Sequence, residues 1–267
     1  MRLKDKVVAV TASTRGIGYA CVEACAKEGA VVYMAARNLE RAKKSAEEFR
    51  EQGYDVRVVY HDATKPESNA SMVEEIVKEA GRIDVLVNNF GSTDVKKDLD
   101  FLNTSYEDFH EILDLNLRTV YEVSQKAAEK MAEQGGGSIV NISSIGGVLP
   151  DISRIAYAVS KNAINYLTKN MALQLGRSGI RVNSVCPGQT ATDAVMDNMS
   201  EQFQEFFNRH TPIRRMGKPE EDAHLVVYLA SEESAYTTGQ VISVSGGFGL
   251  GTPVYADLAE MSAKNRG

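Results

Sequence analysis

Residues 6–18 read Lys6-Val-Val-Ala-Val-Thr-Ala-Ser-Thr-Arg-Gly-Ile-Gly18. The apolar run up to Thr11 predicts a buried strand, and the small residues after it predict a loop that opens into a helix through Lys27. In such a unit, glycines let the backbone approach a diphosphate, and the helix N-terminus supplies N–H groups and a positive dipole end. The stretch therefore predicts a dinucleotide site, although Ala12 stands where the first glycine is usual.

The end of the second predicted strand, residues 30–36, bears on the choice of cofactor. A site for NAD places Asp or Glu there to bind the ribose hydroxyls, whereas this chain has Arg37 and Asn38. Arg37 offers a planar fork suited to a 2′-phosphate, and Arg15 in the glycine loop could add a second cation. The alternative is two solvated surface arginines. The absence of an acidic residue at this position and the presence of Arg37 together predict NADP as the cofactor.

Strands alternate with helices along the rest of the chain. Further strands are predicted at 55–61, 83–88, 137–142, 179–186 and 240–244, with helices at 38–52, 67–80, 105–133, through Tyr157 to about 175, and at 219–231. This order predicts an α/β fold, a Rossmann-type doubly wound parallel sheet of about seven strands. We expect a single domain over residues 1–255, with a lid at about 189–215, and a C-terminal tail at 256–267.

Polar residues that follow the predicted strands are candidate site residues, because ligands bind at the carboxyl edge of open α/β sheets. Asp62 has two interpretations, as an acceptor for an adenine amino group or as part of turn chemistry before Pro66. Asn89 and Gly91 fit a turn and equally a loop under a cofactor. Asn116 is polar among apolar helical neighbours, so it needs partners or belongs to a site.

The stretch 143–161 carries the chemistry. Tyr157 and Lys161 are four apart and share one helix face, and Ser144 lies thirteen positions before Tyr157. A lysine cation about 5 Å away favours the phenolate by roughly 3 kcal/mol, which predicts a lowered tyrosine pKa suited to acid–base catalysis. The serine hydroxyl can hold a substrate oxygen. Tyr-x-x-x-Lys alone favours an ordinary amphipathic helix, and the serine and the surrounding motifs reverse that interpretation.

Five apolar side chains recur at near-helical spacing in the predicted lid: Met196, Met199, Phe203, Phe206 and Phe207. They could line an apolar pocket, or they could pack the lid onto the body, which is the commoner reason for such a stripe.

Composition narrows the possible partners. A net charge of −6 argues against nucleic acid or an anionic membrane. No stretch approaches the roughly 18 apolar residues of a membrane span, and we expect a cytoplasmic protein. The three cysteines and four histidines form neither a disulfide framework nor a ligand set, so no metal is expected.

These motifs resemble the short-chain dehydrogenase/reductase family over essentially the whole chain. The matches are Thr11 to Gly18, Asn88 to Gly91, Asn116, Ser144, Tyr157-x-x-x-Lys161, and Pro187-Gly188 with Thr192. Phe90 stands where the family normally has Ala.

The resemblance implies roles for these residues. Tyr157 is the acid/base, Ser144 polarises the carbonyl, Lys161 binds the nicotinamide ribose and lowers the tyrosine pKa, and Asn116 holds a water in a proton relay. The implied cofactor contacts are Thr11, Ser13, Thr14, Arg15, Gly16, Ile17, Gly18, Arg37, Asn38, Asp62, Asn89, Gly91, Tyr157, Lys161, Pro187, Gly188, Thr190 and Thr192. The implied substrate contacts are Ser144, Ile145, Tyr157, Met196 and Met199.

Within the family, residues 11–18, 150–157 and 251–253 resemble the bacterial NADP-dependent 7α-hydroxysteroid dehydrogenases. This resemblance implies oxidation or reduction at the 7α position of bile acids, and the family's usual assembly implies a homotetramer. A 3-oxoacyl-thioester or generic carbonyl reductase is an alternative, which the acidic lid flank disfavours. A non-catalytic NADP-binding sensor is another, but it has no need of Ser144, Asn116, Tyr157 and Lys161 together.

Overall fold

A seven-stranded parallel sheet forms the centre of the molecule, with strand order β3-β2-β1-β4-β5-β6-β7. The structure, a computed structural model, describes residues 1–197, 199–252 and 254–264. The strands are β1 Val7–Thr11, β2 Val31–Ala36, β3 Val56–Tyr60, β4 Val85–Asn88, β5 Gly137–Ile142, β6 Ile180–Pro187 and β7 Val241–Val244. The predicted fold class is confirmed.

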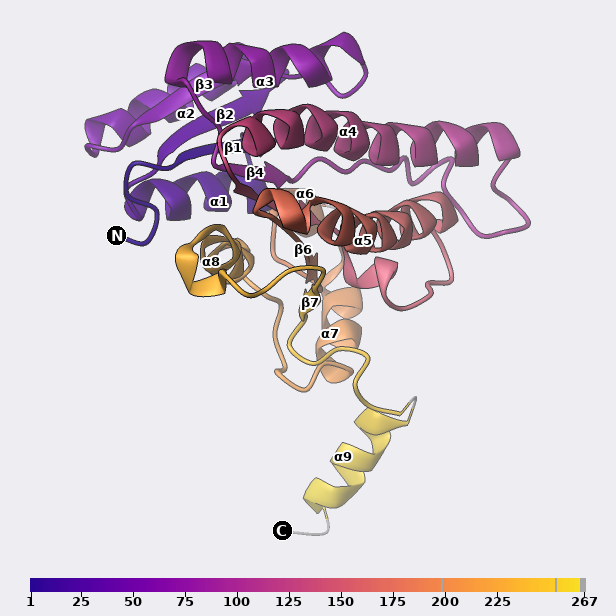
Figure 1. Cartoon of the computed structure of the whole chain (residues 1–267). Coiled ribbons are helices and arrows are strands. Elements are labelled where there is room, and N and C mark those ends of the chain that lie inside the picture. Colours follow the sequence, from indigo (N-terminus) through magenta and orange to yellow (C-terminus); the bar gives the residue numbers. More distant parts are fainter. Residues whose placement is uncertain (198, 253, 265–267) are drawn as a thin grey trace.

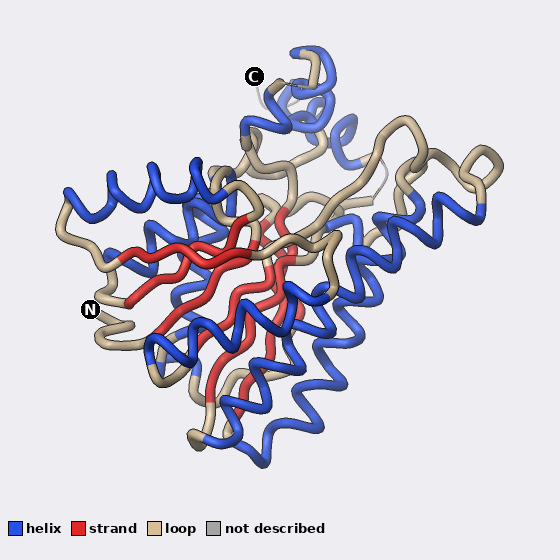
Figure 2. The backbone as a smooth tube through the Cα atoms, turned by 90° about the horizontal axis from the view of Figure 1, so that it is seen from above, coloured by secondary structure: helices blue, strands red, loops and turns tan. Residues whose placement is uncertain are grey.

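Helices cover both faces of the sheet (Figures 1 and 2). Helices α1 Gly16–Lys27, α2 Leu39–Glu51 and α8 Pro219–Ala230 enclose one buried apolar cluster with the strands. Helices α3 Glu67–Ala80, α4 Tyr106–Glu133 and α5 Ile155–Leu175 enclose the other. Short 3₁₀ turns are η1 Ile145–Gly147, η2 Gly176–Ser178 and η3 Glu232–Ser234.

The sequence of β1 explains why it lies between two helical layers. Val8 and Val10 belong to the first apolar cluster, whereas Val7 and Ala9 belong to the second. Successive strand side chains point to opposite faces, so a continuous apolar run supplies both cores. The strand order reverses between β1 and β4, and the carboxyl edge at that reversal is where open α/β sheets bind ligands.

The lid and the tail contain helices that the sequence did not delimit. Residues 189–215 include α6 Asp193–Met196 and α7 Glu201–Arg209, and the predicted tail forms α9 Tyr255–Lys264. Figure 1 shows α9 projecting from the body below α7. Arg209 joins the two helices, because it donates to Glu260 at 2.8 Å and pairs with Asp257. Pro253 and residues 265–267 lie outside the described residues.

Within the described residues, every helix is too short or too polar to cross a bilayer.

Candidate active site

Tyr157 and Lys161 lie where α5 crosses the ends of β4 and β5. The Lys161 Nζ is 5.6 Å from the centroid of the Tyr157 ring, and it donates to the carbonyl of Ile142 at 2.9 Å. A Cβ built on Gly91 would lie 2.6 Å from that Nζ, so only glycine fits there without displacing the lysine. The structure therefore brings the phenol, the ammonium and two strand ends together.

Ser144 completes this cluster from the end of β5. Its Oγ accepts from the N–H of Gly146 at 3.1 Å, which starts η1. The same hydroxyl tends to lower the pKa of the nearby Tyr157 phenol. The three side chains that the sequence singled out for chemistry thus lie in one place.

The electrostatics of this cluster differ from the sequence-based expectation. Burial raises the pKa of Tyr157, and the hydrogen bond from Ser144 and the Arg154 guanidinium oppose that rise without cancelling it. Burial also lowers the pKa of Lys161 to about 8. The predicted lowering of the tyrosine pKa is therefore not seen in this chain, because desolvation outweighs the effects of Ser144 and of the Arg154 cation.

Asn116, in α4, is fully buried and has three partners. Its Nδ2 donates to Ser92 O at 2.9 Å and to Ser160 Oγ at 3.0 Å, and its Oδ1 accepts from Ser92 N at 2.9 Å. Ser160 in turn donates to the carbonyl of Tyr157 at 2.7 Å. Sequence reasoning missed Ser160, because a lone serine in a predicted helix carries no distinguishing signal.

The glycine loop after β1 has the features of an anion site. Ala12 and Gly16 both have left-handed backbone, with φ of 51° and 56°. No described side chain caps the N-terminus of α1, and its first turn contains no acidic residue. The exposed Arg15 and Arg37 add positive charge at this edge. Uncapped helix N–H groups and two guanidinium groups suit the anionic diphosphate of a dinucleotide.

Close packing fixes the shape of this loop. A Cβ on Gly18 would lie 2.4 Å from Asn89 Nδ2, and one on Gly16 would lie 3.2 Å from Thr192 Cγ2. The start of the lid therefore lies against the glycine loop. Thr14 and Ile17 are partly exposed there.

Some predicted cofactor residues direct their side chains into the protein. Thr11 Oγ1 accepts from Asn89 N at 2.9 Å and from Phe90 N at 3.1 Å, and Ser13 Oγ donates to Ala35 O at 3.4 Å. Both hydroxyl groups are fully buried, so these residues hold the loops after β1 and β4 to each other and to the end of β2.

Asp62 and Asn38 make local turn contacts. Asn38 caps α2 by accepting from Arg41 N at 3.0 Å. Asp62 accepts from Thr64 N at 3.1 Å and from Thr64 Oγ1 at 2.8 Å. These contacts are the turn chemistry that the sequence offered as the alternative to adenine binding. Burial tends to raise the pKa of Asp62, but these hydrogen bonds and the cation of Arg37 outweigh it, and the net pKa lies below its usual value.

The loop after β6 is anchored to α8 and β7. Gly188, which follows Pro187, donates to Val244 O at 2.9 Å, and a Cβ on it would lie 2.7 Å from Ser245 Cα. Thr190 is buried and donates to Asp222 Oδ2 at 3.1 Å. The hydroxyl of Thr190 is therefore engaged within the protein.

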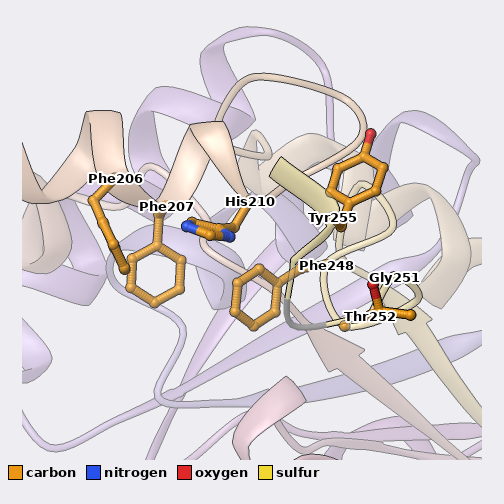
Figure 3. A pocket seen from close by; sticks show the side chains of 8 residues that line it. Phe206, Phe207, His210, Phe248, Gly251, Thr252 and Tyr255 are labelled. Carbon is orange, nitrogen blue, oxygen red and sulfur yellow. The ribbon is translucent and has the colours of Figure 1, made fainter. Parts of the chain in front are cut away.

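A cavity of about 290 Å³ lies between the lid and the chain end (Figure 3). Its walls include Phe206, Phe207 and His210 from α7 and its C-terminal end, with Phe248 opposite. The rings of Phe207 and Phe248 stack with centroids 5.2 Å apart. Gly249, also in the wall, packs on Leu149, since a Cβ there would lie 2.1 Å from Leu149 Cδ1. Through Gly249 the cavity wall therefore contacts the loop that starts at Ser144, although Ser144, Tyr157 and Lys161 do not line the cavity.

None of the predicted substrate contacts, Ser144, Ile145, Tyr157, Met196 and Met199, lines this cavity. Met196 is 47% exposed, and Met199 accepts from Gln189 Nε2 through its sulfur at 3.3 Å. Neither methionine lines the aromatic cavity. Ile145 is partly buried next to Ser144.

A doubly wound parallel sheet, a glycine loop opening a helix at its reversal point, and a Ser–Tyr–Lys cluster at neighbouring strand ends define a nicotinamide-dependent oxidoreductase. A family model described as enoyl-(acyl carrier protein) reductase matches residues 11–249. The chain belongs to the short-chain dehydrogenase/reductase family.

Individual relatives are similar over nearly the whole chain. A 7α-hydroxysteroid dehydrogenase of Clostridium sardiniense is 49% identical over 96% of this chain and 98% of its own. A 3-oxoacyl-(acyl-carrier-protein) reductase of Thermotoga maritima is 38% identical over 92% of this chain and 99% of its own. A solved 7α-hydroxysteroid dehydrogenase, complexed with NADH and 7-oxo glycochenodeoxycholic acid, is 31% identical with a TM-score of 0.88, covering 92% of this chain and 95% of that one.

Proposed function

We propose that this protein is an NADP-dependent oxidoreductase that interconverts the 7α-hydroxyl group and the 7-ketone of bile acids. The observation that carries the substrate assignment is the 49% identity, over nearly both full lengths, to a 7α-hydroxysteroid dehydrogenase. The homotetramer and the cytoplasmic location implied by family resemblance remain predictions alongside it.

The side chains at the strand ends have distinct roles in this proposal. Bound NADP supplies the hydride donor or acceptor. Ser144 holds the substrate oxygen, and Tyr157 donates a proton to that oxygen in ketone reduction or removes it in alcohol oxidation. Lys161, with a pKa of about 8, is largely protonated at neutral pH, so its charge opposes the rise that burial causes in the pKa of Tyr157.

The aromatic cavity is consistent with an apolar substrate. One of its wall residues, Gly249, contacts Leu149 in the segment that begins at Ser144. A flat, largely apolar ring system suits a pocket lined by phenylalanine rings.

A substrate panel tests the proposal. Purified protein and NADP are mixed with bile acids that differ only in the position and face of one hydroxyl group, and the reduced cofactor is followed by absorbance. We expect turnover of the 7α epimer and little of the 3α, 7β or 12α hydroxyl groups. A 3-oxoacyl thioester belongs in the panel, because a 3-oxoacyl-(acyl-carrier-protein) reductase is 38% identical. Preference for the thioester would replace the steroid assignment.

The cofactor assignment is tested at Arg37. Replacing Arg37 with Asp removes the planar cation and supplies the acid that a ribose diol prefers. We expect the ratio of kcat/KM with NADP to that with NAD to fall by about 100-fold or more. Arg50→Asp, at the other end of α2, is the matched control and should leave the ratio unchanged. An unaltered ratio in Arg37→Asp would refute the role of Arg37.

A further inference from the structure

The N-terminus of α5, the helix that carries Tyr157, is capped by a residue from a distant loop. The residue that precedes the helix, Arg154, has left-handed backbone with φ of 55° and offers no side-chain cap. Asp98, in the loop between β4 and α4, takes that place. We infer that Asp98 is a positioning residue for Tyr157, an inference that rests on the acid/base role proposed for the tyrosine.

The carboxylate of Asp98 is committed to this contact. Its Oδ1 accepts from Ala156 N at 2.8 Å, and its Oδ2 accepts from the N–H of Tyr157 itself at 3.0 Å. Thr93 Oγ1 donates to the same Oδ2 at 2.7 Å. Asp98 is only 1% exposed, so water does not substitute for these partners.

Physical chemistry makes this cap a strong one. A carboxylate at a helix N-terminus gains from the positive end of the dipole and from charge-assisted hydrogen bonds to free N–H groups. A buried carboxylate that lost these donors would be strongly disfavoured, so the loop and the helix start are held in one arrangement. Because one donor is the N–H of Tyr157, a shift of Asp98 moves the backbone that carries the phenol.

The same loop reaches Tyr157 by a second route. Ser92 is bonded through both its N–H and its C=O to Asn116, and Asn116 bonds Ser160, which donates to the Tyr157 carbonyl. The segment 92–98 therefore connects to the N–H of Tyr157 at one end and to its carbonyl at the other. This segment directly follows Gly91, so it links the cofactor edge of β4 to the tyrosine.

The experiment compares Asp98→Ala, Asp98→Asn and Tyr157→Phe in the full-length protein. Each variant is assayed at saturating substrate well below its unfolding temperature, and its NADP(H) Kd is measured separately by cofactor fluorescence. For Asp98→Ala we expect kcat to fall by about 10- to 100-fold, because a misplaced reacting group loses rate steeply, while the Kd changes less than about 3-fold. Asp98→Asn should recover part of kcat, since its amide oxygen keeps one acceptor.

Ser105→Ala is the matched control. Ser105 caps α4 by accepting from Asp108 N at 3.1 Å, so its loss lowers the unfolding temperature by a few degrees without changing kcat. If Asp98→Ala does not fold, Thr93→Val replaces it in the test, because it removes the hydroxyl that donates to Asp98 Oδ2. The expected fall in kcat is then about 3- to 10-fold.

The outcomes separate this inference from the proposed function. Asp98→Ala with kcat within 2-fold of the parent, or with kcat and cofactor affinity lost equally, overturns the positioning role. A loss of kcat in Ser105→Ala equal to that in Asp98→Ala overturns it as well. Retained turnover in Tyr157→Phe instead overturns the function on which it rests.

Discussion

At the scale of single residues, Ala12 has a conformation that its side chain disfavours. Its φ is 51°, and left-handed backbone costs an L-residue roughly 1–2 kcal/mol, whereas achiral glycine adopts it freely. This is the position where the sequence departs from the usual glycine, so the departure has a structural cost. The chain tolerates it because the Ala12 carbonyl accepts from Asn89 Nδ2 at 3.1 Å, which holds the loop.

Ala12→Gly should therefore stabilise the protein. We expect a gain of about 0.5–1 kcal/mol in the free energy of unfolding, because relief of strain exceeds the extra entropy of glycine in the unfolded chain. Urea unfolding of the cofactor-free protein measures it. Ala26→Gly in α1, where helical geometry suits alanine, should destabilise by about 1 kcal/mol. Equal signs for the two changes would contradict the argument.

Asp222 is a buried acid without a full set of partners. It is 1% exposed, one oxygen accepts from Thr190, and its Oδ1 has no partner among the described residues. Burial raises the pKa of Asp222 to about 7, partly offset by Thr190 and augmented by the carboxylate of Glu221. The Cys21 thiol, whose own pKa burial raises, also lies near it.

This pKa predicts how stability depends on pH. The unfolded chain releases the Asp222 proton near pH 3.8, whereas the folded protein keeps it to about pH 7. Stability is therefore lost as the pH rises through this window, by on the order of 4 kcal/mol. Asp222→Asn should not show that loss. The unfolding free energy of the variant should therefore rise relative to that of the parent between pH 4 and pH 8.

The neighbouring Glu221 provides the control for this measurement. Hydrogen bonding from Arg215 lowers the pKa of Glu221 to about 2, so its contribution is already complete above pH 5. Glu221→Gln removes only the part of the Asp222 pKa shift that the Glu221 charge adds, so its effect on stability should change much less between pH 5.5 and pH 8 than that of Asp222→Asn. A pH-independent difference for Asp222→Asn would contradict the assignment.

At the scale of elements, η1 and α5 approach each other as closely as a glycine permits. A Cβ on Gly147 would lie 2.7 Å from the carbonyl carbon of Lys161 and 2.9 Å from Asn162 N. The Gly147 carbonyl accepts from Asn162 and Asn165 side chains at 2.9 and 3.1 Å. This contact sets the spacing between Ser144, which starts η1, and the helix that carries the tyrosine.

Gly147→Ala should separate the two elements. The clash is with backbone atoms that have no rotamer to yield, so we expect about 1–3 kcal/mol of destabilisation and a fall in kcat of at least about 10-fold. Steady-state kinetics and urea unfolding measure the two effects. Gly176→Ala, at the other end of α5, meets nothing within 4 Å and should be neutral or slightly stabilising. Normal kcat in Gly147→Ala would show that the spacing is not critical.

Apolar periodicity predicted the sheet and its main helices, because each strand supplies two cores and the pattern is local. The catalytic cluster followed from residues within nineteen positions of one another. Asp98 was missed because its partners, Ala156 and Tyr157, lie 58 and 59 positions away. Helix α9 was missed for a similar reason, since its contacts to Arg209 span about fifty positions. The direction of the tyrosine pKa depends on burial, which spacing does not report.

At the scale of the whole molecule, α4 and α5 pack against each other and leave several large apolar side chains exposed. Tyr121 of α4 is 51% exposed, and Tyr166 and Leu173 of α5 are 70% and 83% exposed. Tyr166 and Leu173 are seven positions apart, so they share one face of the helix that also carries the catalytic tyrosine. Exposed apolar residues gathered on adjoining helices are characteristic of an interface between subunits.

Leu173→Glu tests whether this helical face holds the expected homotetramer together. Sedimentation velocity of the parent protein should show a tetramer, and the variant should show smaller species, because an unpaired carboxylate in an apolar interface loses more in desolvation than the interface returns. Phe101→Glu makes the same chemical change at a loop residue that is 81% exposed, and it should leave the assembly intact.

A monomeric parent would exclude the tetramer, whereas a tetramer that survives Leu173→Glu would place the subunit contacts on another surface. Because α5 carries Tyr157 on its opposite side, dissociation in Leu173→Glu should also lower kcat if subunit contacts hold that helix in place.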